Sequence, residues 1–466
     1  ARFRSGDHGG SVAMRGKPTR REPSLQMSEA NAAPTSAPHR RRQRVVRARR
    51  TYNQWVANQT MEDFALRFTA ESGRTWSISR VANTALGSIA FLACEAVGAT
   101  ITLNYGTEST LWALGAMALV IIMTGAPICY YAARYGVDMD LLTRGSGFGY
   151  IGSTVTSAIY ASFTFILFSF EAAILSAALE LCLGIPLPVG YVISALVVLP
   201  AAAFGIRRIG ALQTWSQPIW LVLQLAPLVF ILLRPRAELE GWAGFAGRSG
   251  DGFSLAAFGA ASAVLLSLLP QIGEQVDYLR FLPRKTKANG LAWWSGLMLA
   301  GPGWILIGGI KILIGSVLAV MALDAGLAAA QAAQPATLYH LVFGGLVSSP
   351  TAALVLTGLF VAVCQIKINV TNAYAGSIAW SNFFSRLTHS HPGRVVWLVF
   401  NVLVALLLME IGVYKALEQT LALYSNVAIA WVGALVADLV VNKPLGLRPQ
   451  HIEFKRAHLC DINPVG

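Results

Sequence analysis

The stretch 268-LLPQIGEQVDYLRF-281 decides the expected fold, because Pro270 and Gly273 stand in the middle of an apolar segment long enough to cross a bilayer. A second interrupted segment surrounds 92-LACEAVG-98. Unwound backbone is tolerated inside a membrane only where it lines a cavity or is buried in protein. The two stretches therefore predict two broken helices that contribute backbone to one site, although two ordinary kinks would leave the same signature.

Apolar segments of membrane length recur along the chain. Of its 466 residues, 55% are hydrophobic and only 13% are charged, about half the charged fraction of a soluble domain. The interrupted segments are the first and the sixth, five spans apart, as in transporters built from two inverted halves with the solute site at mid-membrane. We predict an all-α integral membrane protein with a five-plus-five inverted-repeat transporter fold and broken helices 1 and 6. Its ten expected spans are 80–104, 107–135, 150–184, 187–204, 212–233, 253–282, 291–321, 350–384, 394–411 and 415–440.

The distribution of charge predicts four regions. About a third of the 36 Lys and Arg residues lie in the first fifty positions, in a polar stretch without periodicity. We interpret 1–50 as a disordered basic arm that contacts anionic lipid, not nucleic acid. An amphipathic pre-membrane segment at 51–79, the ten-helix transporter domain at 80–440 and a cytoplasmic tail at 441–466 follow. Lys and Arg favour the even-numbered connections, which places the N-terminus and the C-terminal tail in the cytoplasm. We expect the spans to cross a bacterial inner membrane. Both chain ends could be incomplete.

Ionisable side chains lie inside the spans, where each costs roughly 2.5 to 3.5 kcal/mol unless it is paired, protonated or hydrated. We expect Lys311 and Glu410 to be structural, because they lie near span ends or lack polar neighbours. We expect the carboxylates of Glu95, Glu171 and Glu274 to receive a proton or a cationic solute. The full set comprises Glu95, Glu171, Glu274, Asp277, Lys311, Lys367 and Glu410.

The eighth span carries polar residues on both sides, within 364-CQIKINVTNAYAG-376. Gln365, Asn369 and Asn372 follow one another at i, i+4 and i+7, so they share one helix face. Such amides offer both donors and acceptors, which suits a planar polar solute. Hydrogen bonding between helices is the other role that amides take in membranes.

Lys367 lies on roughly the opposite face of this span. A buried ammonium needs an anion, and Glu95 in the first break is our candidate. Such a pair could hold two helices together, gate the site, or do both.

Three segments resemble the nucleobase:cation symporter-1 family, whose permeases carry cytosine, purines, uracil, thiamine, allantoin and hydantoins. They are 52-YNQWVANQTMEDFALRFT-69, 135-YGVDMDLLTRGSGFG-149 and 277-DYLRF-281. The resemblance covers about 50–460 and implies the five-plus-five fold of the amino acid–polyamine–organocation superfamily. The family usually has two further spans. The chain is also similar to permease-like modules at the head of sensor histidine kinases.

The resemblance implies a solute stacked between aromatic side chains of spans 3 and 6. Here span 3 offers Phe165 or Phe168, with Phe163 nearby, whereas span 6 has leucine where the family has tryptophan. Gln271 in span 6 joins the expected solute contacts, and Asp277 with Arg280 is expected to close the inner side of that span.

The resemblance also places hydroxyl ligands for sodium at positions that read Lys367 and Ile368 here. An ammonium at that position would replace the cation. We therefore expect that sodium coupling is lost and that Lys367 with Glu95 acts as a built-in substitute.

These features together predict a secondary transporter that moves a small polar, nucleobase-like solute without sodium, with protons as a candidate coupling ion. The alternative is a non-transporting sensor module that binds a solute and signals to a cytoplasmic domain downstream. We expect no enzymatic activity, no cofactor and no bound metal, because no nucleophile–base pair or ligand cluster stands out. The five cysteines show no metal spacing and are expected to act as small hydrophobic side chains.

Overall fold

The computed structural model describes residues 68–248, 250, 253–412 and 416–463. The chain divides into two units, 1–46 and 47–466, and every described residue belongs to the second. The predicted basic arm at 1–50 and most of the pre-membrane segment at 51–79 therefore lie outside the described residues.

All ten predicted spans contain helix. Seven helical segments are long and apolar enough to cross a membrane, and the bent pair formed by the first two helices makes an eighth. In span order they are α1 (Ile78–Ser88) with α2 (Ala93–Tyr105), α3 (Thr107–Tyr135), α5 (Ser153–Leu183), α6 (Leu187–Leu196) with α7 (Leu199–Ala203), α8 (Ile206–Gln224) with α9 (Ala226–Leu232), α11 (Leu255–Leu266) with α12 (Gln271–Leu279), α13 (Gly290–Ala300) with α14 (Trp304–Asp324), α17 (Pro350–Leu387), α18 (Arg394–Glu410), and α19 (Leu417–Ala437), which continues into the turn η5 (Asp438–Asn442).

Spans 4 and 9 are the two that fall short of the membrane criterion. The fourth is the apolar stretch Leu187–Ala203, and α18 has 17 residues. This is the lower limit of the ~17–25 residues that cross a hydrocarbon core.

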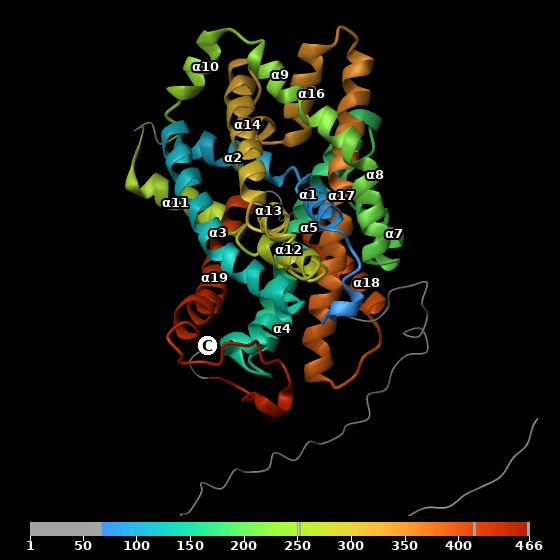
Figure 1. Cartoon of the computed structure of the whole chain (residues 1–466). Coiled ribbons are helices and arrows are strands. Elements are labelled where there is room, and N and C mark those ends of the chain that lie inside the picture. Colours follow the sequence, from blue (N-terminus) through green and yellow to red (C-terminus); the bar gives the residue numbers. More distant parts are fainter. Residues whose placement is uncertain (1–67, 249, 251–252, 413–415, 464–466) are drawn as a thin grey trace, which may run out of the picture. The chain divides into compact units, whose positions relative to one another are not determined.

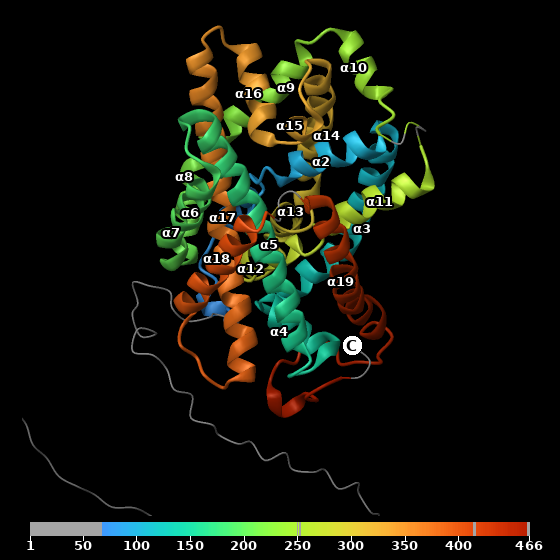
Figure 2. The ribbon, with the colours of Figure 1, turned by 180° about the vertical axis from the view of Figure 1, so that it is seen from behind.

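Shorter helices cover the two ends of the bundle. Figures 1 and 2 show α10 and α16 at one end, and α4 with the C-terminal tail at the other; we call these the α10 end and the α4 end. The sequence predicted only a connection at 322–346, where the structure has two helices. The short elements are η2 (Glu71–Gly73), α4 (Met139–Thr143), η3 (Arg144–Phe148), α10 (Arg236–Ala243), α15 (Ala329–Ala332), α16 (Pro335–Leu346) and η6 (Arg456–His458).

Both predicted helix breaks are present. The first span bends by 46° between α1 and α2, where residues 89–92 leave the helix just before Glu95. The sixth span is interrupted at 267–270, and α12 begins directly after Pro270. Its bend is smaller, so both halves form one span of 25 residues.

The backbones of α2 and α14 touch where they cross. A Cβ atom on Gly98 would lie 1.9 Å from the carbonyl oxygen of Ile312, and one on Gly315 would lie 2.1 Å from that of Glu95. Small residues allow this close approach between membrane helices. The contact holds the half of span 1 that follows the break against span 7.

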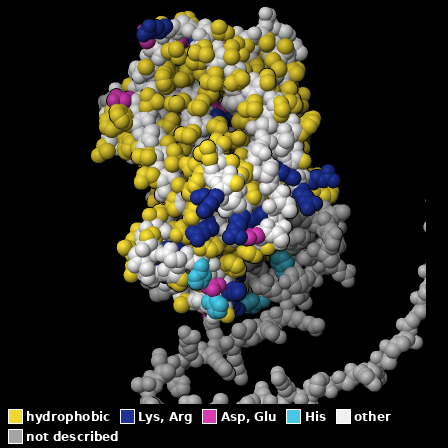
Figure 3. Space-filling view, in the orientation of Figure 1, with side chains coloured by type: hydrophobic (Ala, Val, Ile, Leu, Met, Phe, Trp, Pro, Cys, Tyr) yellow, Lys and Arg dark blue, Asp and Glu magenta, His cyan; other side chains and the backbone are white. Residues whose placement is uncertain are grey.

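The outer surface is suited to lipid. Figure 3 shows hydrophobic side chains over most of the visible face and Lys and Arg side chains gathered in its lower part. Large apolar side chains such as Leu232 and Leu291 are 82% and 85% exposed. Apolar surface of this extent requires a membrane or a partner, and with the spans above it identifies a multi-pass membrane protein.

The α2–α14 crossing makes the first prediction. Gly315→Ala should lower the melting temperature, because its methyl group would meet backbone atoms that no rotamer change can move; overpacking of this kind costs about 1–3 kcal/mol. Gly309→Ala, on the same helix, is the matched control, because its Cβ meets only the Leu114 side chain at 3.8 Å. Thermal unfolding of the purified proteins measures both, and equal melting temperatures would contradict the close crossing.

Candidate functional site

The break in span 1 is held by a carboxylate from span 3. Glu171 of α5 is fully buried. Its Oε2 accepts a hydrogen bond of 3.1 Å from the backbone N–H of Leu92, and its Oε1 accepts one of 3.1 Å from that of Ala93. The first N–H groups of a helix have no partner within the helix, and negative charge is favourable there. Glu171 therefore anchors the start of α2.

Glu95 forms the centre of a second buried network, toward the α10 end. The Lys311 ammonium donates to Glu95 Oε1 at 2.7 Å and to Gln224 Oε1 at 3.0 Å. The Tyr339 hydroxyl donates to Glu95 Oε1 at 2.9 Å. The other carboxylate oxygen, Oε2, is buried and accepts no hydrogen bond from the described residues. The network joins α2, α14, α8 and α16.

The expected pairing of Lys367 with Glu95 is wrong. Lys367 Nζ donates to the backbone oxygen of Gln213 at 3.1 Å, to Ser216 Oγ at 3.0 Å and to Gln217 Oε1 at 3.1 Å, all on α8. Among the described residues, no carboxylate forms an ion pair with it. Helical spacing placed Lys367 on the face opposite the amides, but spacing alone could not show that α8 covers this face.

The first span lies close to the same place. Gln213 Nε2 donates to the backbone oxygen of Lys367 at 2.8 Å. A Cβ atom on Gly87 of α1 would lie 2.3 Å from Gln213 Oε1. Lys367 is therefore held where α17 and α8 meet, with α1 packed against the same glutamine.

The amide face of α17 has buried polar atoms without partners. Gln365, Asn369 and Asn372 are each 0% exposed. The side-chain nitrogen and oxygen of Asn369 and Asn372 form no hydrogen bond with any described residue, whereas the Gln365 side chain lies in hydrogen-bonding position beside Glu171. A buried polar group left without a partner costs about 1–3 kcal/mol. A solute or a water molecule that formed hydrogen bonds with these predicted amides would remove this cost.

Span 6 adds a carboxylate with one free oxygen. Glu274 in the first turn of α12 accepts a hydrogen bond of 3.0 Å from Gln271 Nε2 on its Oε2. Its Oε1 and both polar atoms of Gln275 are buried without a partner in the described part of the chain. Thr371 of α17 lies beside Glu274, and Gln365 lies beside Glu171. The predicted residues of spans 3, 6 and 8 thus come together around the break in span 1.

The aromatic side chains of span 3 divide between two sides of α5. Phe165 stacks on Trp380 of α17, with ring centroids 6.1 Å apart and planes at 6°. Phe163 faces Tyr424 of α19 at 6.4 Å. Phe168 is fully buried and lies one helical turn before Glu171. Phe168 is therefore the span-3 ring on the helix face that holds the break.

Toward the α4 end, the inner half of span 6 lines a small cavity. Asp277 Oδ2 accepts a hydrogen bond from the Tyr160 hydroxyl at 3.3 Å. Arg280 Nε donates to the backbone oxygen of Asp277 at 3.2 Å, and its Nη2 donates to the Tyr374 hydroxyl at 3.3 Å. The cavity next to them is lined by Asp138, Met139, Asp140, Thr143, Thr156, Ser157, Tyr160, Asp277, Ile378, Ala379, Asn382 and Trp431.

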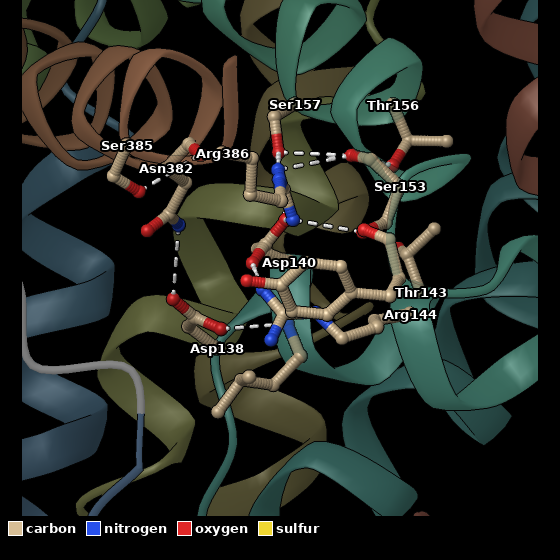
Figure 4. Close-up of polar contacts among 12 residues, drawn as sticks. Asp138, Asp140, Thr143, Arg144, Ser153, Thr156, Ser157, Asn382, Ser385 and Arg386 are labelled. Atoms are coloured by element: carbon tan, nitrogen blue, oxygen red, sulfur yellow. Dashed lines mark hydrogen bonds and ion pairs between the residues drawn. The ribbon is translucent and has the colours of Figure 1, made fainter. Parts of the chain in front are cut away.

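A buried ionic cluster around Asp140 borders this cavity (Figure 4). Asp140 of α4 bridges two arginines, with 2.7 Å from Oδ2 to Arg144 Nη2 and 2.6 Å from Oδ1 to Arg386 Nη1. Arg386, in the last turn of α17, also donates to Ser157 Oγ at 2.5 Å and to Ser153 Oγ at 2.8 Å. The cluster ties α4 and the start of α5 to the end of α17.

This cluster was not among the residues predicted from the sequence. The i, i+4 spacing of Asp140 and Arg144 lay inside the quoted segment 135–149, and could have signalled a helical ion pair. Arg386 is distant in sequence, and only the fold brings it to Asp140. Tyr339 and Gln224 were missed for the same reason.

The five cysteines are free thiols, of which Cys94, Cys129 and Cys364 are buried. Within the described residues, no group of three or more His, Cys, Asp or Glu side chains is arranged to hold a metal ion.

Several solved transporters share this architecture. The inward-facing conformation of Mhp1 aligns with a TM-score of 0.62 at 17% identity, covering 85% of this chain and 81% of that chain. Mhp1 is described as a nucleobase-cation-symport-1 family transporter, and its closed conformation with bromovinylhydantoin bound gives 0.60 at 16% identity, covering 81% of each chain. This chain has the fold of that transporter. The five-plus-five fold with two broken helices is therefore confirmed.

The likeness extends to other symporters. A substrate-bound, outward-open Na⁺-coupled sialic acid symporter gives a TM-score of 0.56 at 13% identity, covering 83% of this chain and 82% of that chain. No family model and no curated protein matches the sequence. At these identities the comparisons establish the fold and do not extend to the solute.

The Glu95–Lys311 pair makes the second prediction. Lys311→Met should lower thermal stability strongly, because breaking a buried pair costs about 3–5 kcal/mol. Adding Glu95→Gln should recover a large part of the loss, since no buried charge then stands alone. The control is to break the exposed pair Arg236–Glu240, whose side chains are 92% and 69% exposed. Its loss should change the free energy of unfolding by less than about 1 kcal/mol. A double variant no more stable than Lys311→Met would contradict the pairing.

The Asp140 cluster makes the third prediction. Arg386→Ala should loosen the α4 end, so that a cysteine introduced at Ala379 reacts with a polar thiol reagent roughly 10-fold faster than in the parent. The parent protein for this assay carries Cys460→Ser, because Cys460 is exposed. Arg284→Ala, at a side chain 74% exposed, is the control and should leave the rate unchanged. Equal rates for Arg386→Ala and its parent would exclude the cluster as a closure.

Proposed function

We propose that this chain is a secondary transporter that moves a small, planar, polar solute of nucleobase-like shape across the inner membrane of a bacterium. The amide face of α17 carries the proposal, because the buried side-chain nitrogen and oxygen atoms of Asn369 and Asn372 lack partners among the described residues. Interhelical amides would be bonded to a neighbouring helix. A site prepared for a solute would leave them free, because a bound polar edge then completes the hydrogen bonds.

The surroundings of these amides support a transport path. The solute would rest between the amide face, the break in span 1 and Glu274 of α12, with Phe168 as the aromatic neighbour. The small cavity beside Asp277 and the Asp140–Arg386 cluster would form the closure toward the α4 end, which we assign to the cytoplasm together with the N-terminus. Solved symporters of this fold span inward-facing, closed and outward-open conformations, and we propose the same cycle here.

We propose further that sodium is not the coupling ion. The ammonium of Lys367 occupies the junction of α17, α8 and α1 with three oxygen acceptors around it, at the position where the family resemblance predicts sodium ligands. A positive charge there opposes a second cation. Protons are the coupling ion we propose, carried by the buried carboxylates of Glu95 and Glu171. Neither a cofactor nor an enzymatic step enters this scheme.

One observation favours the sensor as the second candidate. The C-terminal tail is bonded to the turn after the Asp140 cluster, since the Tyr150 and Ile151 N–H groups donate to the backbone oxygens of Cys460 at 2.9 Å and Asp461 at 2.7 Å. The Tyr150 ring also lies between the guanidinium groups of Arg144 and Arg456, at 4.9 and 4.6 Å. A movement of the cluster would reach the tail, as a signal to a downstream domain requires. Flux in proteoliposomes separates the two functions, because a sensor binds solute without transporting it.

The fourth prediction tests the amide face. Asn372→Ala should weaken solute binding about 10-fold, the equivalent of one or two hydrogen bonds at about 1 kcal/mol each. Binding is measured by thermal stabilisation of the purified protein with uracil, cytosine, allantoin and hydantoin, each with and without sodium. Asn426→Ala is the control, because Asn426 is exposed and, among the described residues, donates hydrogen bonds to backbone oxygens of its own helix, α19. Unchanged affinity in Asn372→Ala would remove this residue from the site, and a sodium-dependent shift would refute the role given to Lys367.

A further inference from the structure

Glu274 differs from the other buried carboxylates near the helix breaks. Glu95 is paired with Lys311, and Asp140 is paired with two arginines. Glu171 has no cation but receives two backbone hydrogen bonds. Glu274 is 1% exposed, and its hydrogen-bonding neighbours are two neutral groups, the Gln271 amide and the Thr371 hydroxyl. It is therefore the least compensated of these carboxylates.

The groups around Glu274 do not neutralise it. They are the Gln271 amide, the Thr371 hydroxyl and the carboxylates of Asp277 and Glu171. The two lysines of the region are engaged elsewhere, Lys311 with Glu95 and Lys367 with oxygens of α8. A buried carboxylate without a cation is strongly unfavourable unless it binds a proton or a positive ligand.

The free oxygen of Glu274 belongs to the same site as the amides. Glu171, which holds the break in span 1, interacts with Glu274 and also lies beside the Gln365 amide of α17. The unpartnered oxygens of Asn369 and Asn372 add acceptors to the carboxylate. Acceptors gathered around one negative charge match a flat cation that carries several N–H donors.

We propose that the solute is a planar cation of the amidinium or guanidinium type, whose N–H groups meet the free oxygen of Glu274. This inference rests on the proposed function and narrows its solute class. The carboxylate supplies the charge and one edge of the contact, and the amide face of α17 binds the rest of the plane.

Isosteric pairs of solutes test the charge separately from the shape. The purified full chain is titrated with guanidinium and with urea, and with acetamidinium and with acetamide, and binding is read from calorimetry at concentrations far below those at which guanidinium and urea denature proteins. Each cation should bind at least 10-fold more tightly than its neutral partner. Equal binding of the two members of a pair would overturn the inference without any variant being needed.

The Glu274→Gln variant tests whether Glu274 is the group that distinguishes a cationic solute from its neutral partner. The substitution should weaken binding of guanidinium at least 10-fold and bring it close to that of urea. Glu180→Gln is the control, because Glu180 is exposed near the end of α5, and it should leave both affinities unchanged. Retention of the full preference in Glu274→Gln would assign the charge recognition elsewhere and overturn the proposal.

The outcomes separate this inference from the proposed function. If uracil or hydantoin binds in a manner that depends on Asn372 while the cations do not bind, the transporter site stands and the cationic solute is wrong. If no solute of either set binds, the solute site itself is wrong. Preferential binding of the cations through Glu274 supports both.

Discussion

A break in a membrane helix leaves backbone donors in a medium without water, and the hydrogen bonds from Leu92 and Ala93 to Glu171 answer this constraint. Without the carboxylate, two N–H groups at the start of α2 would be buried and unpaired. The interaction fixes the position of α2 relative to α5. From that point α2 crosses α14. Gly98 packs against the backbone of Ile312, and Gly315 packs against the backbone of Glu95, so that the Glu95 side chain lies against Lys311.

The polar groups of the interior fall into two classes with different physical roles. Glu95 with Lys311, and Asp140 with its two arginines, are buried ion pairs with close hydrogen bonds. Buried charges need such partners if the protein is to stay folded. The second class consists of side chains that carry buried polar atoms without a hydrogen-bond partner among the described residues: Asn369, Asn372 and Glu274. The ion pairs hold together the helices on either side of the proposed solute site. The unpartnered atoms raise the free energy of the protein, and hydrogen bonds to a bound solute would lower it.

The helix α17 connects these classes along its length. Its amide face is turned to the centre, Lys367 is turned to α8, and Arg386 in its last turn is bonded to α4 and α5. Figure 2 shows α17 beside α5, and these two helices pack together more extensively than any other pair. One helix therefore connects the centre to the α4 end, where Tyr150 in turn contacts the C-terminal tail.

The sequence by itself determined the class of protein, the ten helical segments and both breaks, because hydropathy, helical period and the positions of Pro270 and the glycines act over short stretches of chain. It also placed the three amides on one face of span 8 and Lys367 on the opposite one. The tertiary structure alone decided which groups meet: Lys311 and not Lys367 against Glu95, Glu171 on the backbone of the break, and Arg386 on Asp140. Such pairings join residues tens to hundreds of positions apart, and they depend on how helices rotate and cross, which no local pattern of residues records.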